Sequence, residues 1–551
     1  MPKLILLWIF YLCFSLGAIS QTINLSIEIH ADSPHNKQQL KFSTAKDAEQ
    51  YFFFKIDSLE KSGYPFLTYD KNFESDIIRT KIKLNQKIDT LYLNINEEHL
   101  NLIPETLFVN EHHIEIPYSG FQELQVYILN QLQYEGEPFG KISLKNFSLK
   151  ARNILRANLI IERKKQRKID KINIKGYPKL SKNYVTKFSN LKVGSLFVES
   201  EVQDKTEQLN NIPFLKVRKP TEVLFQKDST ELFIYVEKVN ANSFDGFLGF
   251  GSTEEESFEV NGYLNMVLLN NLNFGERLAV TYKNDGIGQQ TFEGDINLPF
   301  LFNTPISIGA KLRLFRRDSA FSNTTQNLTL NYQLNERLSI MGGVETTNSS
   351  GLETESNPNA NSIQDFNSTF YEVGFNFLKL NTRAQLQEDT FLNLRAGLGQ
   401  RETNEEIDQY KLSITGQYLF SLNSRNKIYT HLNSQILISD TYLNNELFRF
   451  GGVNSIRGFA ENSLIASRFA VLQTEYRYLL DSNLFANTVI DLGNYENEID
   501  NVNENILGYG IGLGLKSKAG IFRLVVANAI SDALNSSLSS SKIHISFRSF
   551  F

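Results

Sequence analysis

The second half of this 551-residue chain alternates between apolar and polar residues, and this pattern constrains the fold more than any other feature. In ISIGAKLRLF one face of a strand collects Ile306, Ile308, Ala310, Leu312 and Leu314. The segments NLTLNYQL, FYEVGFNFLKL, FLNLRAGLG and YKLSITGQYLF alternate in the same way, and stretches rich in Asn, Ser, Asp and Glu separate them. A period of two residues predicts antiparallel strands with one apolar face. That face lies either in the core of a soluble sandwich or against lipid around a membrane barrel.

One strand favours the barrel over the sandwich. In LGYGIGLGLKS large apolar residues share one face, and the other face has four glycines, Gly508, Gly510, Gly512 and Gly514. A sandwich has to fill its inner face, whereas a barrel wall can place glycines where something packs closely inside. Residues 241–551 have room for about 16 strands of ten residues with roughly ten residues per connection, and 14 strands is the alternative. Because only closure hides strand edges in lipid, we expect a closed barrel.

Residues 21–240 have a different rhythm and divide into three predicted units, 21–96, 97–167 and 168–240. The third unit shows a strand in KIDKINIKGY, a helix capped by Ser181, a second helix from Val198, and a hairpin with Leu232, Ile234 and Val236 on one face. The predicted order is β-α-α-β-β. The helix 121–136 marks the second unit, and TAKDAEQYFFFKIDSLEKSG, between the strands INLSIEI and TLYLNI, marks the first. The exposed edge of a small sheet can accept an extended peptide as an extra strand, although such units can also be spacers.

Charge changes at the same position as the rhythm. Residues 21–240 carry 32 Lys and Arg against 28 Asp and Glu, whereas residues 241–551 carry 23 against 33. This shift supports a domain boundary near residue 240. A basic cluster at 163–168 would suit an acidic surface or lipid head groups, or it is a solvated linker.

The N-terminal segment LILLWIFYLCFSLGAIS follows Lys3 and ends in small residues of the kind that a signal peptidase reads. It predicts a secretory signal over residues 1–20 with cleavage before Gln21, and an uncleaved anchor helix is the alternative. The single cysteine, Cys13, lies inside this segment, so the predicted mature chain has no disulfide and no thiolate chemistry. Export without cysteines is typical of a bacterial envelope protein.

The segment 439–467 is long and apolar for a loop that faces water, which indicates that it folds into the barrel lumen. It contains FRFGGVNSIRGFAEN, with Arg457 in a glycine-rich turn. A buried arginine needs carboxylate partners, and strand alternation places Glu475 and Asp491 on the inward faces of the next two strands. A planar guanidinium can bind two carboxylates at once. The sequence therefore predicts a lumenal lock, and the alternative is a solvated loop arginine.

These segments resemble parts of the BamA/TamA superfamily of outer-membrane insertases and translocases. The stretch from Phe450 to Phe459 resembles the signature of the inward-folded sixth extracellular loop, in which the arginine pairs with acids on the next two strands. The resemblance implies a loop lock formed by Gly451, Gly452, Ile456, Arg457, Gly458 and Phe459. The three units of the first half resemble POTRA domains. The terminal strand KIHISFRSFF ends in aromatic residues, as does the insertion signal of outer-membrane barrels, and Phe547 and Phe551 would supply it.

The resemblance implies a chain in the bacterial outer membrane with its N-terminal domains in the periplasm. POTRA units would receive unfolded outer-membrane or secreted polypeptides, and the barrel, with a weak seam between its first and last strands, would insert or translocate them. A secretion pore for a dedicated partner and a passive porin or binding barrel are the alternatives. Outer-membrane lipid and accessory subunits are further expected partners.

The sequence lacks the common motifs of catalysis and ligand binding. One departure from the resemblance leaves the subfamily of the chain open. The sequence has no phosphate-binding loop, no metal-ligand spacing and no nucleophile constellation, so we expect no enzyme activity, metal or cofactor, and no nucleic acid partner. Many relatives have a Thr-Pro-x-Gly turn before an arginine-containing strand. Here Ala519 and Gly520 replace that turn, while Arg523 remains.

Overall fold

The computed structural model describes residues 23–30, 36–74, 77–251, 259–284, 288–317, 320–352, 363–379, 389–517, 519–531 and 541–551. The predicted signal segment 1–20 lies outside these residues. The chain divides into two compact units: residues 1–168 with 195–199, and residues 169–194 with 200–551. In the described ranges, no helix has both the length and the apolar character needed to cross a membrane.

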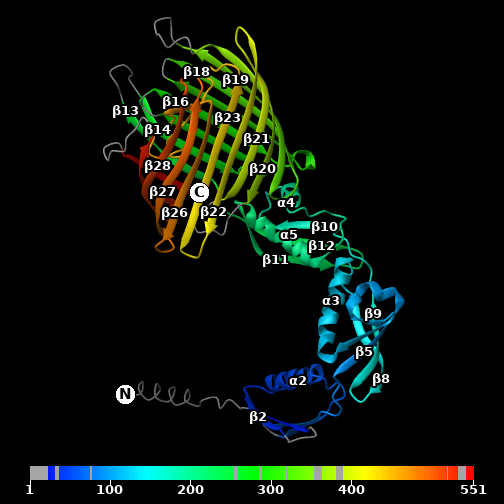
Figure 1. Ribbon diagram of the computed structural model, residues 1–551. Coiled ribbons are helices and arrows are strands. Elements are labelled where there is room, and N and C mark those ends of the chain that lie inside the picture. The colour runs from blue at the N-terminus through cyan, green and yellow to red at the C-terminus, as the bar shows by residue number, and fades with distance from the viewer. Residues whose placement is uncertain are drawn as a thin grey trace, which may run out of the picture. The chain divides into compact units, whose positions relative to one another are not determined.

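The first domain is one sheet covered by one helix (Figure 1). Its elements are β1 (Ile23–His30), β2 (Asn36–Phe42), α2 (Ala45–Lys61), β3 (Thr68–Glu74) and β4 (Ile77–Lys83). The strand order is β2-β1-β4-β3, and α2 buries Ala48, Phe52 and Ile56 in a core shared with β1 and β4. The order in this domain is therefore β-β-α-β-β, which differs from the order β-α-α-β-β predicted for the third unit. The polar segment NKQQLKF pairs with β1 as a second strand, although it carries little apolar alternation.

The second domain has a five-stranded sheet in the order β6-β7-β5-β9-β8. Its elements are β5 (Thr90–Ile95), η1 (Glu97–Leu102), η2 (Glu105–Leu107), β6 (Phe108–Asn110), β7 (His113–Pro117), η3 (Tyr118–Gly120), α3 (Phe121–Tyr134), β8 (Lys141–Ala151) and β9 (Ile154–Glu162). The sequence placed β5 in the first unit, but β5 pairs with β7 and β9 at the centre of this sheet. The boundary expected at 96/97 thus needs correction, because β5 belongs to the second domain. Alternation identified the strand but could not identify its partners.

Part of the basic cluster at 163–168 is used inside this domain. Arg163 Nε donates to Glu137 Oε1 at 3.0 Å, and the same guanidinium pairs with Glu135. The backbone N–H of Lys164 donates to Glu137 Oε2 at 3.1 Å. These contacts hold the chain that leaves β9 against the loop after α3.

The third domain has the predicted order β-α-α-β-β. Its elements are β10 (Lys171–Lys175), α4 (Lys182–Phe188), α5 (Glu199–Glu207), η4 (Gln208–Asn211), β11 (Leu215–Phe225) and β12 (Thr230–Lys238), and the sheet order is β10-β12-β11. Ser181 caps α4, because its hydroxyl accepts from the N–H of Tyr184 at 3.4 Å. The predicted apolar face of β12, with Leu232, Ile234 and Val236, is buried.

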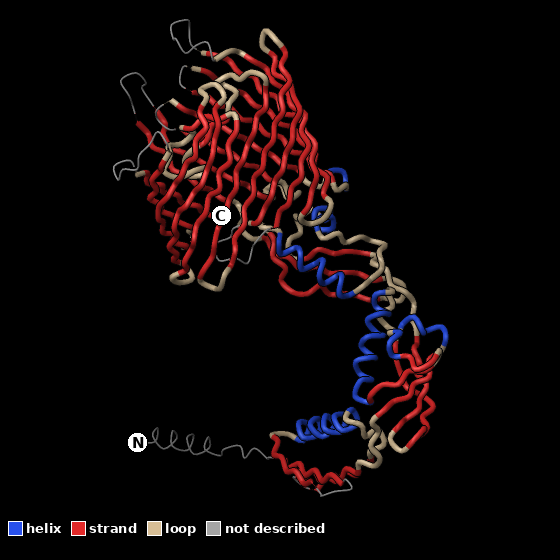
Figure 2. The backbone as a smooth tube through the Cα atoms, viewed as in Figure 1, coloured by secondary structure: helices blue, strands red, loops and turns tan. Residues whose placement is uncertain are grey.

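The second half forms a closed antiparallel barrel of 16 strands, as predicted, and the alternative of 14 strands is excluded (Figures 1 and 2). The strands are β13 (Ser243–Gly251), β14 (Glu259–Leu269), β15 (Arg277–Asn284), β16 (Gln289–Leu298), β17 (Ile306–Arg317), β18 (Phe321–Gln333), β19 (Leu338–Gly351), β20 (Phe366–Lys379), β21 (Thr390–Glu402), β22 (Glu406–Ser421), β23 (Asn426–Ser439), β26 (Arg468–Leu479), β27 (Leu484–Asn497), β28 (Val502–Lys516), β29 (Ile521–Ile530) and β30 (Lys542–Phe550). A 3₁₀-helix, η5 (Leu301–Asn303), lies between β16 and β17.

Strand β17 shows the two faces of the wall, apolar outside and polar inside. On β17, Leu312 and Leu314 are exposed on the outer surface, while Arg313 between them lines the lumenal cavity. This arrangement matches the predicted face of the strand. It is the alternation expected of strands whose outer face contacts lipid.

The barrel closes through its shortest strand pairing. β13 and β30 share three residue pairs, from Ser243–Phe550 to Asp245–Arg548. The neighbouring pairings are longer, with nine pairs between β13 and β14 and seven between β29 and β30. The seam is therefore held by fewer main-chain hydrogen bonds than the neighbouring strand pairs of the described wall are.

Candidate functional site: the lumenal loop and its arginine

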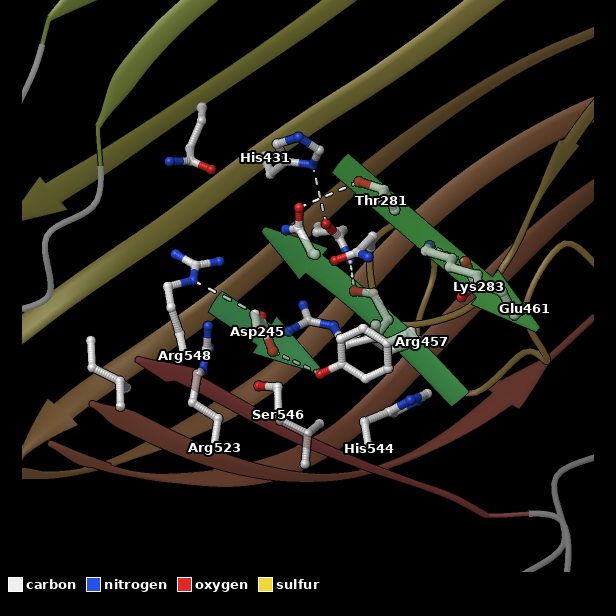
Figure 3. Close-up of a pocket in the computed structure, with 18 of the residues that line it drawn as sticks. Asp245, Thr281, Lys283, His431, Arg457, Glu461, Arg523, His544, Ser546 and Arg548 are labelled. Atoms are coloured by element: carbon white, nitrogen blue, oxygen red, sulfur yellow. Dashed lines mark hydrogen bonds and ion pairs between the residues drawn. The ribbon is translucent and has the colours of Figure 1, made fainter. Parts of the chain in front are cut away.

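The segment between β23 and β26 folds inward, as the sequence predicts. It carries a small hairpin of β24 (Phe448–Phe450) and β25 (Leu464–Ala466). The tip between these strands, including Arg457 and Glu461, lines a lumenal cavity of about 990 Å³ (Figure 3). The loop therefore occupies the bore of the barrel.

Arg457 is held by the two predicted carboxylates. Its Nε donates to Asp491 Oδ2 at 2.8 Å and its Nη2 to Asp491 Oδ1 at 2.5 Å, which is a two-pronged contact. Its Nη1 pairs with Glu475 Oε1. The backbone N–H of Arg457 also donates to Asp491 Oδ2 at 2.9 Å, so Asp491 fixes the main chain as well as the side chain. All three side chains are at most 4% exposed, and charge-assisted bonds in such a setting are the strong ones.

Two further arginines share Glu475, and the sequence analysis did not assign them to the lock. Arg477 Nε donates to Glu475 Oε2 at 2.6 Å, and Arg523 Nη2 donates to the same oxygen at 2.8 Å. Arg477 also lies over the ring of Tyr429 at 4.2 Å. Both arginines occupy inward positions of wall strands. The alternation that placed Glu475 on an inward face predicts the same inward position for Arg477 and Arg523.

Glycines allow the loop to approach the wall. Gly458 has a φ of +96°, and a Cβ there would lie 2.3 Å from the carbonyl oxygen of Asn528 on β29. Gly451 and Gly452 have φ values of +118° and +87°, in the region that favours glycine. On the wall, a Cβ at Gly508 would lie 2.2 Å from the carbonyl oxygen of Arg457. This close approach is what the glycine face of β28 was expected to permit.

The other wall glycines have different neighbours. A Cβ at Gly514 would lie 2.0 Å from the ring of Phe485, and one at Gly512 would meet the side chain of Asn487. Both neighbours belong to the adjacent strand β27. The loop therefore contacts the glycine face of β28 at Gly508, whereas side chains of the wall contact it at Gly512 and Gly514.

An apolar cluster packs around the loop tip. Ile456 and Phe459 are buried together with Phe450, Phe469 and Val471. The rings of Phe450 and Phe469 stack at 4.3 Å with an angle of 5°. The predicted residues on either side of Arg457 therefore shield the ion pairs from water, which strengthens those pairs.

A second anchor holds the beginning of the loop, and sequence reasoning missed it. Arg401 of β21 pairs with Glu446 and donates from Nη1 to the carbonyl oxygen of Thr441 at 3.0 Å. The other oxygen of Glu446 accepts from Gln409 Nε2 at 3.0 Å. Arg401 and Glu446 are almost completely buried. Loop residues follow no period, so no pattern linked Glu446 to a strand that lies 45 residues earlier.

A third contact joins the loop tip to the first strands of the barrel. Lys283 Nζ of β15 donates to Glu461 Oε1 at 2.6 Å (Figure 3). The loop thus contacts β15, β21, β22 and the strands from β26 to β29. It crosses the bore and does not merely line one wall.

The predicted terminal signal residues lie at the seam. Phe547 is on β30 with its ring on the outer surface, and Phe551 follows the strand, its N–H donating to the carbonyl oxygen of Asn242 at 2.9 Å. Their role in insertion stays a prediction. In the described ranges no group of three or more His, Cys, Asp or Glu is placed to hold a metal ion.

The geometry defines a class of protein: a closed barrel with an outer apolar face, a lumenal loop locked by buried ion pairs, and α/β domains before the first barrel strand. Residues 343–515 match the family of the haemolysin secretion/activation proteins ShlB/FhaC/HecB. No curated protein matches the sequence.

Solved structures share the fold. CdiB from Escherichia coli is 14% identical with a TM-score of 0.53, over 92% of this chain and 98% of that one. CdiB from Acinetobacter baumannii is 12% identical with a TM-score of 0.52, over 96% and 90%. BamA from Haemophilus ducreyi lacking POTRA domains 1–3 is 15% identical with a TM-score of 0.50, over 83% and 98%. The chain thus shares the fold of the CdiB and BamA structures, in agreement with the resemblance that its sequence predicted.

Proposed function

We propose that this chain assembles or translocates polypeptides at the bacterial outer membrane, with its α/β domains in the periplasm and without covalent chemistry. The proposal is carried by two features in combination: sheet edges in the N-terminal domains that have no strand partner among the described residues, and a barrel whose lumen holds a loop locked by side chains. A passive pore needs neither feature. Unfolded polypeptides are the proposed substrate, and outer-membrane lipid and accessory subunits are the proposed further partners.

The first domain offers a receiving surface at the outer edge of β3. This strand ends the sheet order β2-β1-β4-β3, so it has no partner on its outer side among the described residues. Tyr69 and Phe73 lie opposite the buried Ile82 and Ile78 of β4, on the face that α2 covers, yet both remain exposed. Phe53 of α2 is exposed as well. The unpaired strand edge and the exposed aromatic side chains beside it suit an extended peptide with apolar side chains.

One ion pair joins the helix α2 to the edge strand β3. Lys71 of β3 pairs with Glu49 of α2, and its Nζ lies 5.9 Å from the centre of the Phe53 ring. On β3 the side chain of Lys71 lies between those of Tyr69 and Phe73. The pair therefore ties β3 to α2 and leaves the outer edge of β3 in a fixed position.

The seam and the lumen of the barrel suggest two routes for a substrate that leaves the first domain. Three residue pairs close the barrel at β13 and β30, so the seam is the place where the wall opens at least cost. The bore becomes a path if the loop leaves it. Insertion into the membrane would use the first route and secretion the second.

A photo-crosslinking amino acid at Phe73 tests the receiving role. We expect Phe73 in the exported, full-length chain to capture unfolded polypeptide. Phe54 is the matched control, since it is an exposed aromatic residue on the same helix as Phe53 but on the side away from the sheet. Equal capture at both positions, or none at Phe73, would contradict the proposal.

The match to haemolysin secretion/activation proteins favours a second candidate within this class, a secretion pore for one dedicated partner. The same crosslink separates the two. Capture of a single secreted polypeptide would support the dedicated pore, whereas capture of several barrel proteins would support general assembly.

A further inference from the structure

Two turns at the barrel end next to the third domain present large apolar side chains to solvent. In the turn between β14 and β15, Leu272 and Phe274 are each 65% exposed. In the turn between β16 and β17, Phe302 is 94% exposed. A phenylalanine ring this exposed at a fixed position indicates a surface that another apolar phase covers.

The first turn is held rigidly by buried polar groups. Glu276 accepts from the backbone N–H groups of Leu272 and Phe274, at 2.5 and 3.1 Å. The Asn270 side-chain oxygen accepts from the N–H of Gly275 at 2.8 Å. Glu276 and Asn270 are buried, while the two apolar side chains between them point outward. These hydrogen bonds fix the backbone of the turn, so the exposure of Leu272 and Phe274 follows from its conformation and not from flexibility.

The second turn keeps a strained backbone. Phe300, Phe302 and Asn303 have φ values of +52°, +51° and +61°, a conformation unusual for residues other than glycine. Such strain persists where the surroundings enforce it and marks functional sites. Phe300 is buried, and its carbonyl oxygen accepts from Asn183 Nδ2 of α4 at 3.0 Å. Because Phe300 is fixed against α4, the short helix η5 directs the side chain of Phe302 into solvent.

The third domain docks on both turns and so fixes their positions. The Tyr184 ring of α4 lies 5.5 Å from the Phe300 ring and fills the space at Gly275, where a Cβ would lie 2.0 Å from it. Tyr177 donates from its hydroxyl to Asn273 Oδ1 at 2.8 Å. Burial raises the pKa of the Tyr184 phenol far above its usual range. In Figure 2 the short helices α4 and η5 lie together at the rim of the barrel.

The exposed side chains continue the outer apolar face of the barrel. Leu278 and Ile296 form one cross-strand pair on the outer surface beside these turns. Ile306, at the start of β17, is also exposed on that surface. Exposed apolar side chains of the outer face therefore lie at the strand ends beside both turns.

We infer that Leu272, Phe274 and Phe302 form a membrane foot, which inserts into the interfacial layer of the lipid leaflet on the side of the third domain. The occupant is phospholipid, because both turns adjoin strands whose exposed apolar face would contact lipid. Aromatic residues at that depth are favoured, since they join apolar chains to a polar boundary. Through Tyr184 the foot would fix the third domain relative to the bilayer. The inference rests on the barrel lying in a membrane, as the proposed function requires.

Tryptophan quenching tests the foot with little background. The only tryptophan of the chain is Trp8, inside the predicted signal, so Phe302→Trp supplies a single reporter in the mature protein. The full chain is reconstituted in vesicles of phosphatidylcholine with or without bromine on the acyl chains near the head group. We expect brominated lipid to reduce the emission of F302W at least twofold, and F274W to behave in the same way.

Two control variants separate failure of the foot from failure of the barrel. Ile511→Trp lies on the outer face of β28 and reports insertion of the wall, and Leu224→Trp lies near the far end of the β11–β12 hairpin and should keep its emission. Quenching of I511W without quenching of F302W would overturn the foot. Loss of quenching in both would overturn the membrane barrel and, with it, the proposed function.

Discussion

At the scale of single residues, Arg457 should be the side chain on which loop position depends most. Arg457→Ala leaves Glu475 and Asp491 buried with fewer positive partners, and removing one member of a buried pair costs about 3–5 kcal/mol. We expect the free energy of local opening of the loop to fall by that order. Hydrogen exchange at the amides of Ile456 to Phe459 measures it.

Arg468→Ala is the matched control for this variant. Arg468 also pairs with a glutamate, Glu496, but its side chain is 55% exposed. Exposed pairs contribute about 1 kcal/mol or less. If the two variants changed loop exchange equally, the pairing of Arg457 would not be what holds the loop.

The residue scale also shows what the sequence could and could not predict. Glu475 and Asp491 were found because strand parity fixes which side chains point inward. Arg477 and Arg523 follow the same parity and were within reach of the same argument. Glu446 was not, because a loop has no periodicity from which to infer its contact with Arg401.

At the scale of elements, the seat of the loop on β28 depends on Gly508. Gly508→Ala would place a methyl group 2.2 Å from the carbonyl oxygen of Arg457. Forcing such a group into a packed contact costs about 1–3 kcal/mol. We expect loop exchange to rise and the barrel to stay closed, as judged by its circular dichroism.

Gly294→Ala provides the comparison for Gly508→Ala. Gly294 also lies in a wall strand, but its nearest neighbour to an added Cβ, a ring carbon of Phe292, is 3.9 Å away. This variant should behave as the unchanged chain does. Equal effects of both substitutions would show that loss of glycine, and not contact with the loop, is responsible.

The second anchor of the loop should act on a different part of it. Glu446→Gln keeps the shape of the side chain but removes the charge that faces the buried Arg401. We expect exchange to rise about tenfold or more at residues 441–447, in line with about 1.4 kcal/mol for each factor of ten. Exchange at Ile456 to Phe459, which the Arg457 contacts protect, should change less. A uniform rise along the loop would mean that the two anchors act as one.

Elements were predictable where their pattern was strong. Alternation fixed the barrel strands, and capping by Ser181 fixed the start of α4. The hairpin β1–β2 was missed because NKQQLKF has few apolar residues, and β5 was placed in the wrong sheet because pairing depends on segments far along the chain. Tertiary packing decided both cases.

At the scale of the whole molecule, the two N-terminal domains should be separable from barrel insertion. The barrel and the third domain without residues 195–199 form one compact unit, and residues 23–167 belong to the other. We expect a chain that lacks residues 23–167 but keeps its export signal to reach the membrane and resist extraction. Capture of substrate should fall at least tenfold. Undiminished substrate transfer by the shortened chain would instead indicate a simple pore.

The overall architecture was predictable because several independent patterns agreed: the change of rhythm near residue 240, the repeated alternation and the glycine face of β28. Agreement across levels of this kind is what specifies a fold. Docking of the third domain on the barrel turns was not predictable. It depends on Tyr184 filling the space at Gly275, a contact between residues 91 positions apart that neither segment reveals alone.

Placement of the loop inside the barrel is the central claim, and maleimide labelling of single cysteines tests it most directly. The predicted mature chain has no cysteine, so Ser455→Cys in the buried loop tip and Asn501→Cys in an exposed turn at the same end of the barrel each give one site. With a membrane-impermeant maleimide on intact cells, we predict labelling of N501C, no labelling of S455C, and labelling of S455C once Arg457→Ala is added. Labelling of S455C as fast as N501C in the otherwise unchanged chain would contradict the account.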